Sequence, residues 1–430
     1  MCGEIEEGLP RTVSCWSLNR GESQDGCVEF TGRDRNHTRL ILFDVHMLPI
    51  QSERSEFAKP GRTTRTLIAT VLLAALTAIA LGLTASSAQA VPKAPNGFLG
   101  IVPQEGITRK DTIRMKKGKV KNLRVSVPWV WIQPNSPNRF NWAKLDRIVK
   151  VAARDGIRVM PTLYWTPPWM SKRWTNLPVK NKSQMDRWRS FVAAAAARYG
   201  RNGDFWTDPD LPGSGLPRLE IIRWQLWNEP NFHYFATKVK PGQYARLVNA
   251  GSAAIRKKDP KAEIVLGGLF GKPKGPPSKA RDATTYLKQF AAKVKKNSFD
   301  SIAIHPYAAN TGKMKKIMKG FRKAAVKSGL KKKKIYVTEI GWGSGKKTNA
   351  FLTGSQSAQA KQLDSAFRYL VKKRDKLNLK GVYWYAWKDT NPKGKNCSFC
   401  YTIGLFKRNR NKLVAKPAWR KFVKYTRGRP

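Results

Sequence analysis

The sequence predicts an α/β fold, a single (β/α)8 TIM barrel that follows an N-terminal signal peptide. Eight short apolar segments alternate with amphipathic segments over residues 91–430, as expected for repeated βα units. Eight such units suit a closed barrel of this length. The alternative, a doubly wound open sheet, would need a glycine-rich turn after the first strand, and PQEGITRK at 103–110 lacks one.

Each apolar segment has the length of a strand and ends at turn-forming or polar residues. The predicted strands cover residues 98–102, 122–127, 157–165, 221–227, 263–268, 299–305, 335–340 and 381–387. Apolar residues recur at helical spacing between them. The predicted helices cover residues 142–156, 184–200, 244–259 and 358–375, and the first of them closes on Gly156.

The first 90 residues differ from the rest. Arg62 and Arg65 precede a long apolar run that ends in Ala-Gln-Ala, so residues 61–90 are predicted to be a signal peptide cleaved after Ala90. A single transmembrane anchor is the alternative, because the run is long. Cleavage predicts a secreted, extracellular or cell-wall-associated protein that contacts a membrane only transiently. Residues 1–60 are interpreted as an unstructured or mis-assigned extension, with Met47 as a better start.

The charge is concentrated in residues 91–430. Nine basic and ten acidic side chains fall in residues 1–90, which leaves 73 basic and 18 acidic side chains and a net charge of +55. Such a surface suits an acidic polysaccharide or an anionic cell-wall polymer, or is simply a solvated basic surface. The lysine-rich stretch 313–334 is expected on the outer ring of helices. No pattern for specific nucleic-acid recognition is present.

Cys397 and Cys400 are the cysteines that remain after cleavage. In an exported chain they are expected to form a disulfide. A zinc site would need further ligands, and no second CxxC or nearby histidine supplies them. We therefore predict neither a metal nor a cofactor, and the oligomeric state stays open.

Several residues with side chains suited to catalysis or ligand binding lie at the carboxyl ends of the predicted strands. In a (β/α)8 barrel these ends meet at one edge, where the active site lies. Two glutamates, Glu229 and Glu339, end the fourth and seventh strands, in a segment with few acidic residues. A pair of carboxyl groups facing one cavity is what glycosidic bond cleavage needs, with one as acid and the other as nucleophile or base.

Two motifs carry a resemblance to a known group of enzymes. WNEP at 227–230 and VTEIGW at 337–342, whose glutamates are 110 positions apart, resemble the retaining glycoside hydrolases of clan A. The resemblance is strongest to family 39-like and cellulase-like members and spans about residues 97–426. It implies the barrel fold and a carbohydrate substrate.

The resemblance also implies roles for individual residues. Glu229 matches the acid/base and Glu339 the nucleophile. Asn228 matches the residue that hydrogen-bonds the sugar 2-hydroxyl, and Arg124 the arginine that keeps the nucleophile ionised. His305 and Tyr307 of the sixth strand match positions lining the cleaved-sugar site, with Tyr307 beside the nucleophile.

Aromatic residues crowd the same strand ends and suit the flat faces of sugars. Trp384 and Trp387 have opposite strand parity, so only one should face the mouth, and Trp387 is preferred. The predicted substrate-binding residues are Arg124, Trp165, Asn228, His305, Tyr307, Trp342, Trp384 and Trp387.

The sequence thus predicts a secreted retaining glycoside hydrolase that cleaves a β-linked poly- or oligosaccharide. The alternative is a non-catalytic protein that binds a polyanion or a cell-wall polysaccharide on a glycosidase-like barrel.

Overall fold

The protein is described by a computed structural model that covers residues 90–390, 399–410 and 412–430. The predicted extension and nearly all of the predicted signal peptide lie outside the described residues. Among the helices that the structure describes, none has the length and apolarity to cross a membrane.

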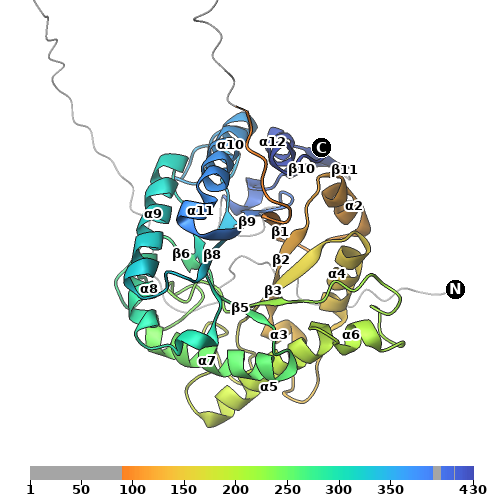
Figure 1. The fold of residues 1–430 in the computed structure, drawn as a ribbon, viewed down its shortest axis with the longest axis vertical. Coiled ribbons are helices and arrows are strands. Elements are labelled where there is room, and N and C mark those ends of the chain that lie inside the picture. Colours follow the sequence, from red (N-terminus) through yellow and green to blue (C-terminus); the bar gives the residue numbers. More distant parts are fainter. Residues whose placement is uncertain (1–89, 391–398, 411) are drawn as a thin grey trace, which may run out of the picture. The chain divides into compact units, whose positions relative to one another are not determined.

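Eight parallel strands close into a barrel surrounded by helices (Figure 1). Neighbours in the sequence are neighbours in the sheet, β1 pairs with β9, and β5 pairs with β7, which closes the ring. A two-residue strand, β6 (Leu269–Phe270), adds to the edge of β7. All eight predicted strands are therefore confirmed. The barrel strands are β1 (Leu99–Val102), β2 (Asn122–Pro128), β3 (Arg158–Tyr164), β4 (Arg223–Leu226), β5 (Glu263–Leu266), β7 (Ser301–His305), β8 (Lys334–Ile340) and β9 (Leu379–Tyr385).

The four predicted helices are confirmed as α4 (Ala143–Arg154), α5 (Lys182–Tyr199), α7 (Pro241–Lys258) and α10 (Gln356–Lys372). Most of the lysine-rich stretch 313–334 forms α9 (Thr311–Lys327) in the outer ring, as expected, and its last residues lead into β8. Side-chain caps start several helices; Asn181, Asn310 and Ser355 each accept a backbone N–H of the first turn. The remaining helical segments are α2 (Arg109–Lys117), α3 (Trp129–Ile132), α6 (Asp204–Thr207), α8 (Ala283–Ala291), η1 (Lys296–Ser298), α11 (Arg374–Leu377), η2 (Cys400–Thr402) and α12 (Pro417–Thr426).

The sheet separates two apolar layers. Inside the barrel a small cluster packs together from six strands, which only side chains on the inner face can do; it consists of Val102, Met160, Val265, Ala303, Tyr336 and Tyr383. Outside the sheet a much larger core fills the space under the helices. Side chains alternate along a strand, so Arg124, the lateral partner of Met160, also points inward.

Polar side chains close the barrel at the amino-terminal ends of the strands. Glu263 at the start of β5 receives hydrogen bonds from Ser301 and Tyr336 and pairs with Arg223 and Lys380. This end of a TIM barrel serves stability, so functional groups are expected at the opposite edge.

The last part of the chain supports loops at that opposite edge. It contains the hairpin of β10 (Phe406–Asn409) and β11 (Lys412–Ala415) and ends in α12. Lys416 is fully buried, and its Nζ lies 2.6 Å from Oδ1 of Asp389 and donates to Ser344 Oγ and Thr402 O. The ammonium thus joins three loop segments.

Candidate active site

Glu339 lies at the carboxyl end of β8 and is held by two donors. Nη1 of Arg124 donates to Oε1 at 2.6 Å, and the hydroxyl of Tyr307 donates to Oε2 at 3.0 Å. Both carboxylate oxygens therefore accept a hydrogen bond, and one donor is a charged group. The predicted contacts of Arg124 and Tyr307 with the nucleophile position are both present.

Arg124 also fixes the neighbouring amide. Its Nη2 donates to Oδ1 of Asn228 at 2.7 Å, while its Nε donates to Gln225. Because the amide oxygen faces Arg124, the Nδ2 group of Asn228 points away from the guanidinium. The three donors of one buried arginine thereby set the geometry of β2, β4 and β8 at the barrel mouth.

Glu229 follows β4 on a strained turn. Trp227 has φ of 70° and Glu229 has φ of 39°, in the left-handed region that side chains seldom adopt. The turn is held by hydrogen bonds from Trp227 N to Leu163 O and from Glu229 N to Gly268 O. Glu229 therefore stands at the mouth as predicted, but it is only 5 % exposed, so its carboxyl group is far drier than a strand-end position alone suggests.

His305 lies between Glu229 and Thr338. Its Nδ1 is 2.6 Å from Oε1 of Glu229, and its Nε2 is 2.9 Å from Oγ1 of Thr338. Gln225 donates to Thr338 Oγ1, so the threonine hydroxyl can donate to Nε2 and leave the ring proton on Nδ1, facing Glu229. The predicted role of His305 in lining the sugar site is wrong, because the ring is fully buried. It positions Glu229 instead.

The two glutamates approach each other closely. One oxygen of each, together with a nitrogen of His305, lie within 4.8 Å of one another. Such a cluster could hold a metal ion by spacing alone. Arg124 already supplies the positive charge, and both oxygens of Glu339 are occupied by donors. The arrangement therefore favours proton transfer and nucleophilic attack over metal binding.

Burial and charge give the site residues different proton affinities. Burial, followed by the negative charge of Glu339, raises the pKa of Glu229 well above its usual range, while Arg124 opposes the shift. Burial and the charge of Arg124 hold the pKa of His305 well below its usual range, so the ring is neutral. The site therefore contains a carboxyl group that retains its proton and a second one held by charged and neutral donors.

Two tryptophans present aromatic surface beyond the carboxyl end of β3. Trp165 follows β3 with φ of 65° and is half-buried, and its ring lies 5.5 Å from that of Trp174, which is 46 % exposed. Oε2 of Glu229 accepts no hydrogen bond from the described residues. Trp165 thus directly follows the carboxyl end of β3 and contacts Trp174, and its role in substrate binding stays a prediction.

Three other tryptophans are not available to a ligand. Trp342, Trp384 and Trp387 are at most 1 % exposed and lie in the core outside the sheet. Their indole N–H groups donate to Ala308 O, Ile403 O and Asp111 respectively. The prediction that these three tryptophans bind substrate is wrong, because packing between the sheet and the helices buries their rings.

Other aromatic residues occupy the mouth near Tyr307. Tyr385, the last residue of β9, shares the inner face with Tyr383 and packs against the cluster around Tyr307. Phe351 and Phe399 come from the loops after β8 and β9, and the ring of Phe399 lies 5.6 Å from that of Tyr307. Sequence reasoning missed all three. The alternation within 381–385 could have identified Tyr385.

Cys400 is disulfide-bonded and buried. Its predicted partner, Cys397, lies outside the described residues.

Two family models match the chain. The glycosyl hydrolase catalytic core matches residues 225–404, which include both glutamates, and a beta-galactosidase model matches residues 102–198. No curated protein matches the chain significantly.

Solved structures share the fold at low sequence identity. A family 39 glycoside hydrolase from Bacteroides cellulosilyticus WH2 has a TM-score of 0.56 and 17% identity, over 78% of this chain and 65% of that one. A monomeric beta-xylosidase from Caulobacter crescentus CB15 has a TM-score of 0.54 and 17% identity, over 78% and 69%. An exo-beta-1,4-mannosidase from Opitutaceae bacterium strain TAV5 has a TM-score of 0.53 and 17% identity, over 80% and 62%.

The chain thus spans about two thirds of the length of these proteins. The chain therefore shares its barrel fold with a family 39 glycoside hydrolase, and two glycoside hydrolase family models match parts of it.

Proposed function

We propose that the protein is a secreted retaining glycoside hydrolase that cleaves O-glycosidic bonds of a β-linked poly- or oligosaccharide by double displacement. The observation that carries this proposal is that one carboxyl oxygen of Glu229 and one of Glu339 lie within 4.8 Å of each other, which leaves no room for a water molecule between these two atoms and their sugar carbon in the manner of an inverting enzyme. Retaining enzymes hold their carboxyl groups about 5–5.5 Å apart, whereas inverting enzymes leave about 6.5–9.5 Å for a water molecule.

The environments of the two glutamates assign their roles in the first step. Glu339, with both oxygens held by donors, attacks the anomeric carbon and forms the glycosyl–enzyme ester. Glu229, whose pKa is raised by burial and by the charge of Glu339, donates its proton to the leaving oxygen.

The second step reverses these roles. After it has donated its proton, Glu229 is a carboxylate. It takes a proton from a water molecule as that water attacks the anomeric carbon of the ester. Glu339 is released as a carboxylate and Glu229 regains its proton. Asn228, whose Nδ2 faces away from Arg124, is suited to donate to the sugar 2-hydroxyl in both transition states.

Two further observations support the finer parts of the proposal. The disulfide at Cys400 fits an oxidising compartment outside the cell, as does the signal-like segment 61–90. A β-linked substrate is supported by the beta-xylosidase and the exo-beta-1,4-mannosidase, whose names state this linkage.

The test is covalent labelling by 2-deoxy-2-fluoro glycosides, which slow the hydrolysis of the ester. The intact mass is expected to rise by one fluorosugar, and peptide mapping is expected to place it on Glu339. Glu339→Gln should abolish the mass increase, while Glu229→Gln should still be labelled by a fluorosugar with a good leaving group. Labelling at another residue, or unchanged turnover in Glu339→Gln, would refute the mechanism.

The competing function is polyanion binding without turnover, motivated by the net charge of +55. It predicts no labelling by any fluorosugar in a folded sample, together with salt-sensitive binding to polyanions. The strained turn at Glu229 argues against it, because a pure binding protein has no use for a buried, protonated carboxyl group beside a second one.

A further inference from the structure

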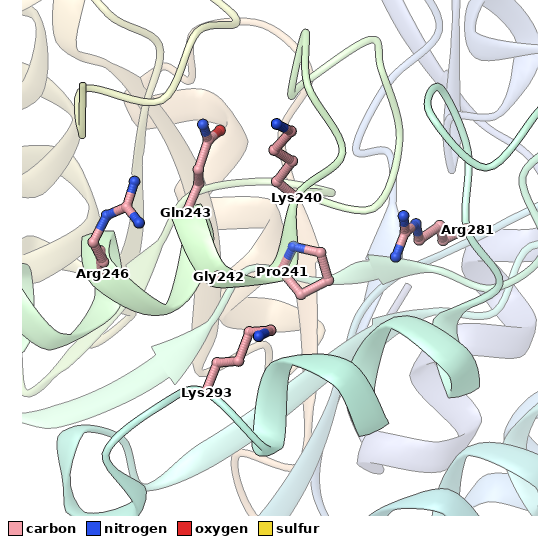
Figure 2. A pocket seen from close by; sticks show the side chains of 7 residues that line it. All are labelled: Lys240, Pro241, Gly242, Gln243, Arg246, Arg281 and Lys293. Atoms are coloured by element: carbon pink, nitrogen blue, oxygen red, sulfur yellow. The ribbon is translucent and has the colours of Figure 1, made fainter.

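A surface pocket lies at the start of α7 (Figure 2). The charged ends of Lys240, Arg246, Arg281 and Lys293 around it point to different sides, so they do not converge on one ligand. The buried polar side chains next to Glu229 do converge, because hydrogen bonds connect them in one path from β2 through β4 and β8 to β7.

The side chain of Gln225 in β4 has no exposed surface and uses both ends of its amide. Its Oε1 accepts hydrogen bonds from Nε of Arg124 at 2.5 Å and from the hydroxyl of Thr162 at 2.9 Å. Its Nε2 donates to Leu266 O at 2.8 Å. A guanidinium can only donate and a carbonyl can only accept, so these neighbours fix which end of the amide is the oxygen.

This orientation turns the NH2 group of Gln225 toward Thr338 in β8. Oγ1 of Thr338 lies 3.4 Å from Nε2 of Gln225 and 2.9 Å from Nε2 of His305. The amide nitrogen cannot accept, so among the described residues the hydroxyl proton of Thr338 has one acceptor, Nε2 of His305. A proton on Nε2 would leave this buried hydroxyl hydrogen unpaired, which costs free energy.

The tautomer of His305 follows from this contact. Burial and the charge of Arg124 hold the pKa of His305 well below its usual range, so the ring is neutral and carries a single N–H. Since Nε2 accepts from Thr338, that proton lies on Nδ1 and is donated to Oε1 of Glu229, at 2.6 Å.

The tautomer in turn determines which oxygen of Glu229 carries the acidic proton. A protonated carboxyl group accepts best at its carbonyl oxygen, so the donor on His305 makes Oε1 the carbonyl and Oε2 the hydroxyl. Oε2 accepts no hydrogen bond from the described residues, so its proton is available to a leaving group. With the opposite tautomer, Nδ1 would accept the proton of Glu229 at Oε1, and the acid would face the histidine.

We propose that Gln225 and Thr338 are positioning residues that hold His305 in its Nδ1–H tautomer and thereby place the proton of Glu229 on Oε2, where the leaving oxygen takes it. This inference rests on the proposed acid role of Glu229. Packing alone does not require the amide and the hydroxyl, because the inner cluster of Val102, Met160, Val265 and Ala303 shows that apolar side chains fill this barrel.

The path also reaches the second glutamate. Arg124, whose Nε fixes the amide of Gln225, donates through Nη1 to Glu339 at 2.6 Å. One set of buried side chains therefore holds the nucleophile and directs the proton of the acid, and both depend on the same guanidinium.

The test compares two identical substitutions next to Gln225. Thr338→Val removes the hydroxyl that contacts His305, and Thr162→Val is the matched control, because its hydroxyl also donates to Gln225 but is not bonded to His305. Two-bond ¹H–¹⁵N correlation spectra of the full chain with ¹⁵N-labelled histidine show which ring nitrogen carries the proton. The signals of His305 are those absent from His305→Phe.

We expect the Nδ1–H tautomer in the parent and in Thr162→Val, and a mixture of both tautomers in Thr338→Val. Thr338→Ser keeps the hydroxyl and should restore the parent spectrum. Gln225→Glu replaces the amide donor by an acceptor, so the hydroxyl of Thr338 should turn toward it and the proton of His305 should move to Nε2.

Kinetics should separate positioning from a structural effect. Thr338→Val should lower kcat about tenfold for aryl glycosides with poor leaving groups and less than about twofold for activated ones, with KM unchanged. Any loss in Thr162→Val should be independent of the leaving group.

Other outcomes would overturn the proposal. A proton on Nε2 of His305 in the parent, or an unchanged tautomer in both Thr338→Val and Gln225→Glu, would contradict it. Equal tautomer changes in the two valine variants would mean that the network serves the fold alone. The spectra need no substrate, so the expected tautomer shifts in a protein that fluorosugars do not label would leave the tautomer control in place and overturn the proposed hydrolase.

Discussion

Nδ1 of His305 lies 2.6 Å from Oε1 of Glu229, and the histidine ring has no exposed surface. Its other nitrogen, Nε2, is hydrogen-bonded to Oγ1 of Thr338 in β8. One neutral ring therefore connects the carboxyl group of Glu229, after β4, to the strand that carries Glu339. The orientation of Glu229 therefore depends on a residue that no substrate can touch.

Replacing His305 with phenylalanine keeps a ring and removes both nitrogens. We expect kcat to fall by about 10- to 100-fold for substrates with poor leaving groups, because Glu229 loses the contact that aims it. KM should change little. Steady-state kinetics on aryl glycosides of graded leaving-group pKa would check this. An equal loss for all leaving groups would mean that the ring supports Glu339 or the fold instead.

The raised pKa of Glu229 predicts the alkaline limit of activity. Protonated Glu229 is the active form, so kcat/KM should fall as pH rises through the pKa of Glu229, well above the usual value of a glutamic acid. Glu339→Gln removes the neighbouring negative charge and should lower that pKa. Carboxyl titration by NMR with ¹³C-labelled glutamate would measure it in parent and variant; an unchanged pKa would contradict the coupling.

The same shift predicts an effect on stability. A carboxyl group with a raised folded-state pKa contributes stability that is complete below its unfolded pKa of about 4.3 and is lost as pH rises through the folded value. Glu229→Gln carries no charge, so it should unfold at a higher temperature than the parent at alkaline pH, with the gap closing towards pH 4. Thermal unfolding across this range is the measurement. A gap that widens in acid would reverse the assignment.

Gly268 provides a steric test of the site. A Cβ atom there would lie 2.0 Å from Nε2 of His305 and 2.5 Å from Oγ1 of Thr338, so Gly268→Ala must displace His305. We expect a destabilisation of about 1–3 kcal/mol and a loss of kcat. Gly106→Ala is the matched control, because nothing lies within 4 Å of its added carbon. Urea unfolding and kinetics on both variants would separate the effects, and full activity in Gly268→Ala would disprove the contact.

Two tryptophans should respond in opposite ways. Trp174→Ala removes an exposed ring beside Trp165 and should raise KM for oligosaccharides by about 5- to 100-fold without changing the unfolding temperature. Trp387→Ala removes a buried ring packed on Phe406 and Trp419 and should cost about 3–5 kcal/mol of stability. A raised KM in Trp387→Ala without a loss of stability would instead support the prediction that Trp387 binds substrate.

The sequence was sufficient for the barrel and for the groups around its two glutamates. The strands were visible as apolar segments, and parallel strands bring their carboxyl ends together whatever the helices do. That rule brings together Asn228, Glu229, Tyr307 and Glu339, whereas Arg124 lies in the first half of β2 and was expected beside them only from the resemblance. It did not reveal how deeply Glu229 is buried, since burial depends on neighbouring loops.

The tryptophan errors have a local cause. Residues 383, 385 and 387 would share one face of a continuous strand, but β9 ends at Tyr385 and the chain turns at Ala386. Trp387 therefore leaves the inner face and packs under α12, and Tyr385 takes its place at the mouth. Strand parity predicts a face only as far as the strand continues, and the end of a strand is hard to locate from one sequence.

The pairing of β1 with β9 has a consequence for the order of events during synthesis. A ribosome releases the chain from its first residue, yet the ring of strands cannot close until Tyr385 has emerged. The contacts of Lys416 with Asp389 and Ser344 form still later. Arg124 and Glu229 therefore lack their final neighbours until nearly the whole polypeptide has been synthesised. A chain truncated before that point would contain Glu229 but would lack the closed barrel that surrounds it.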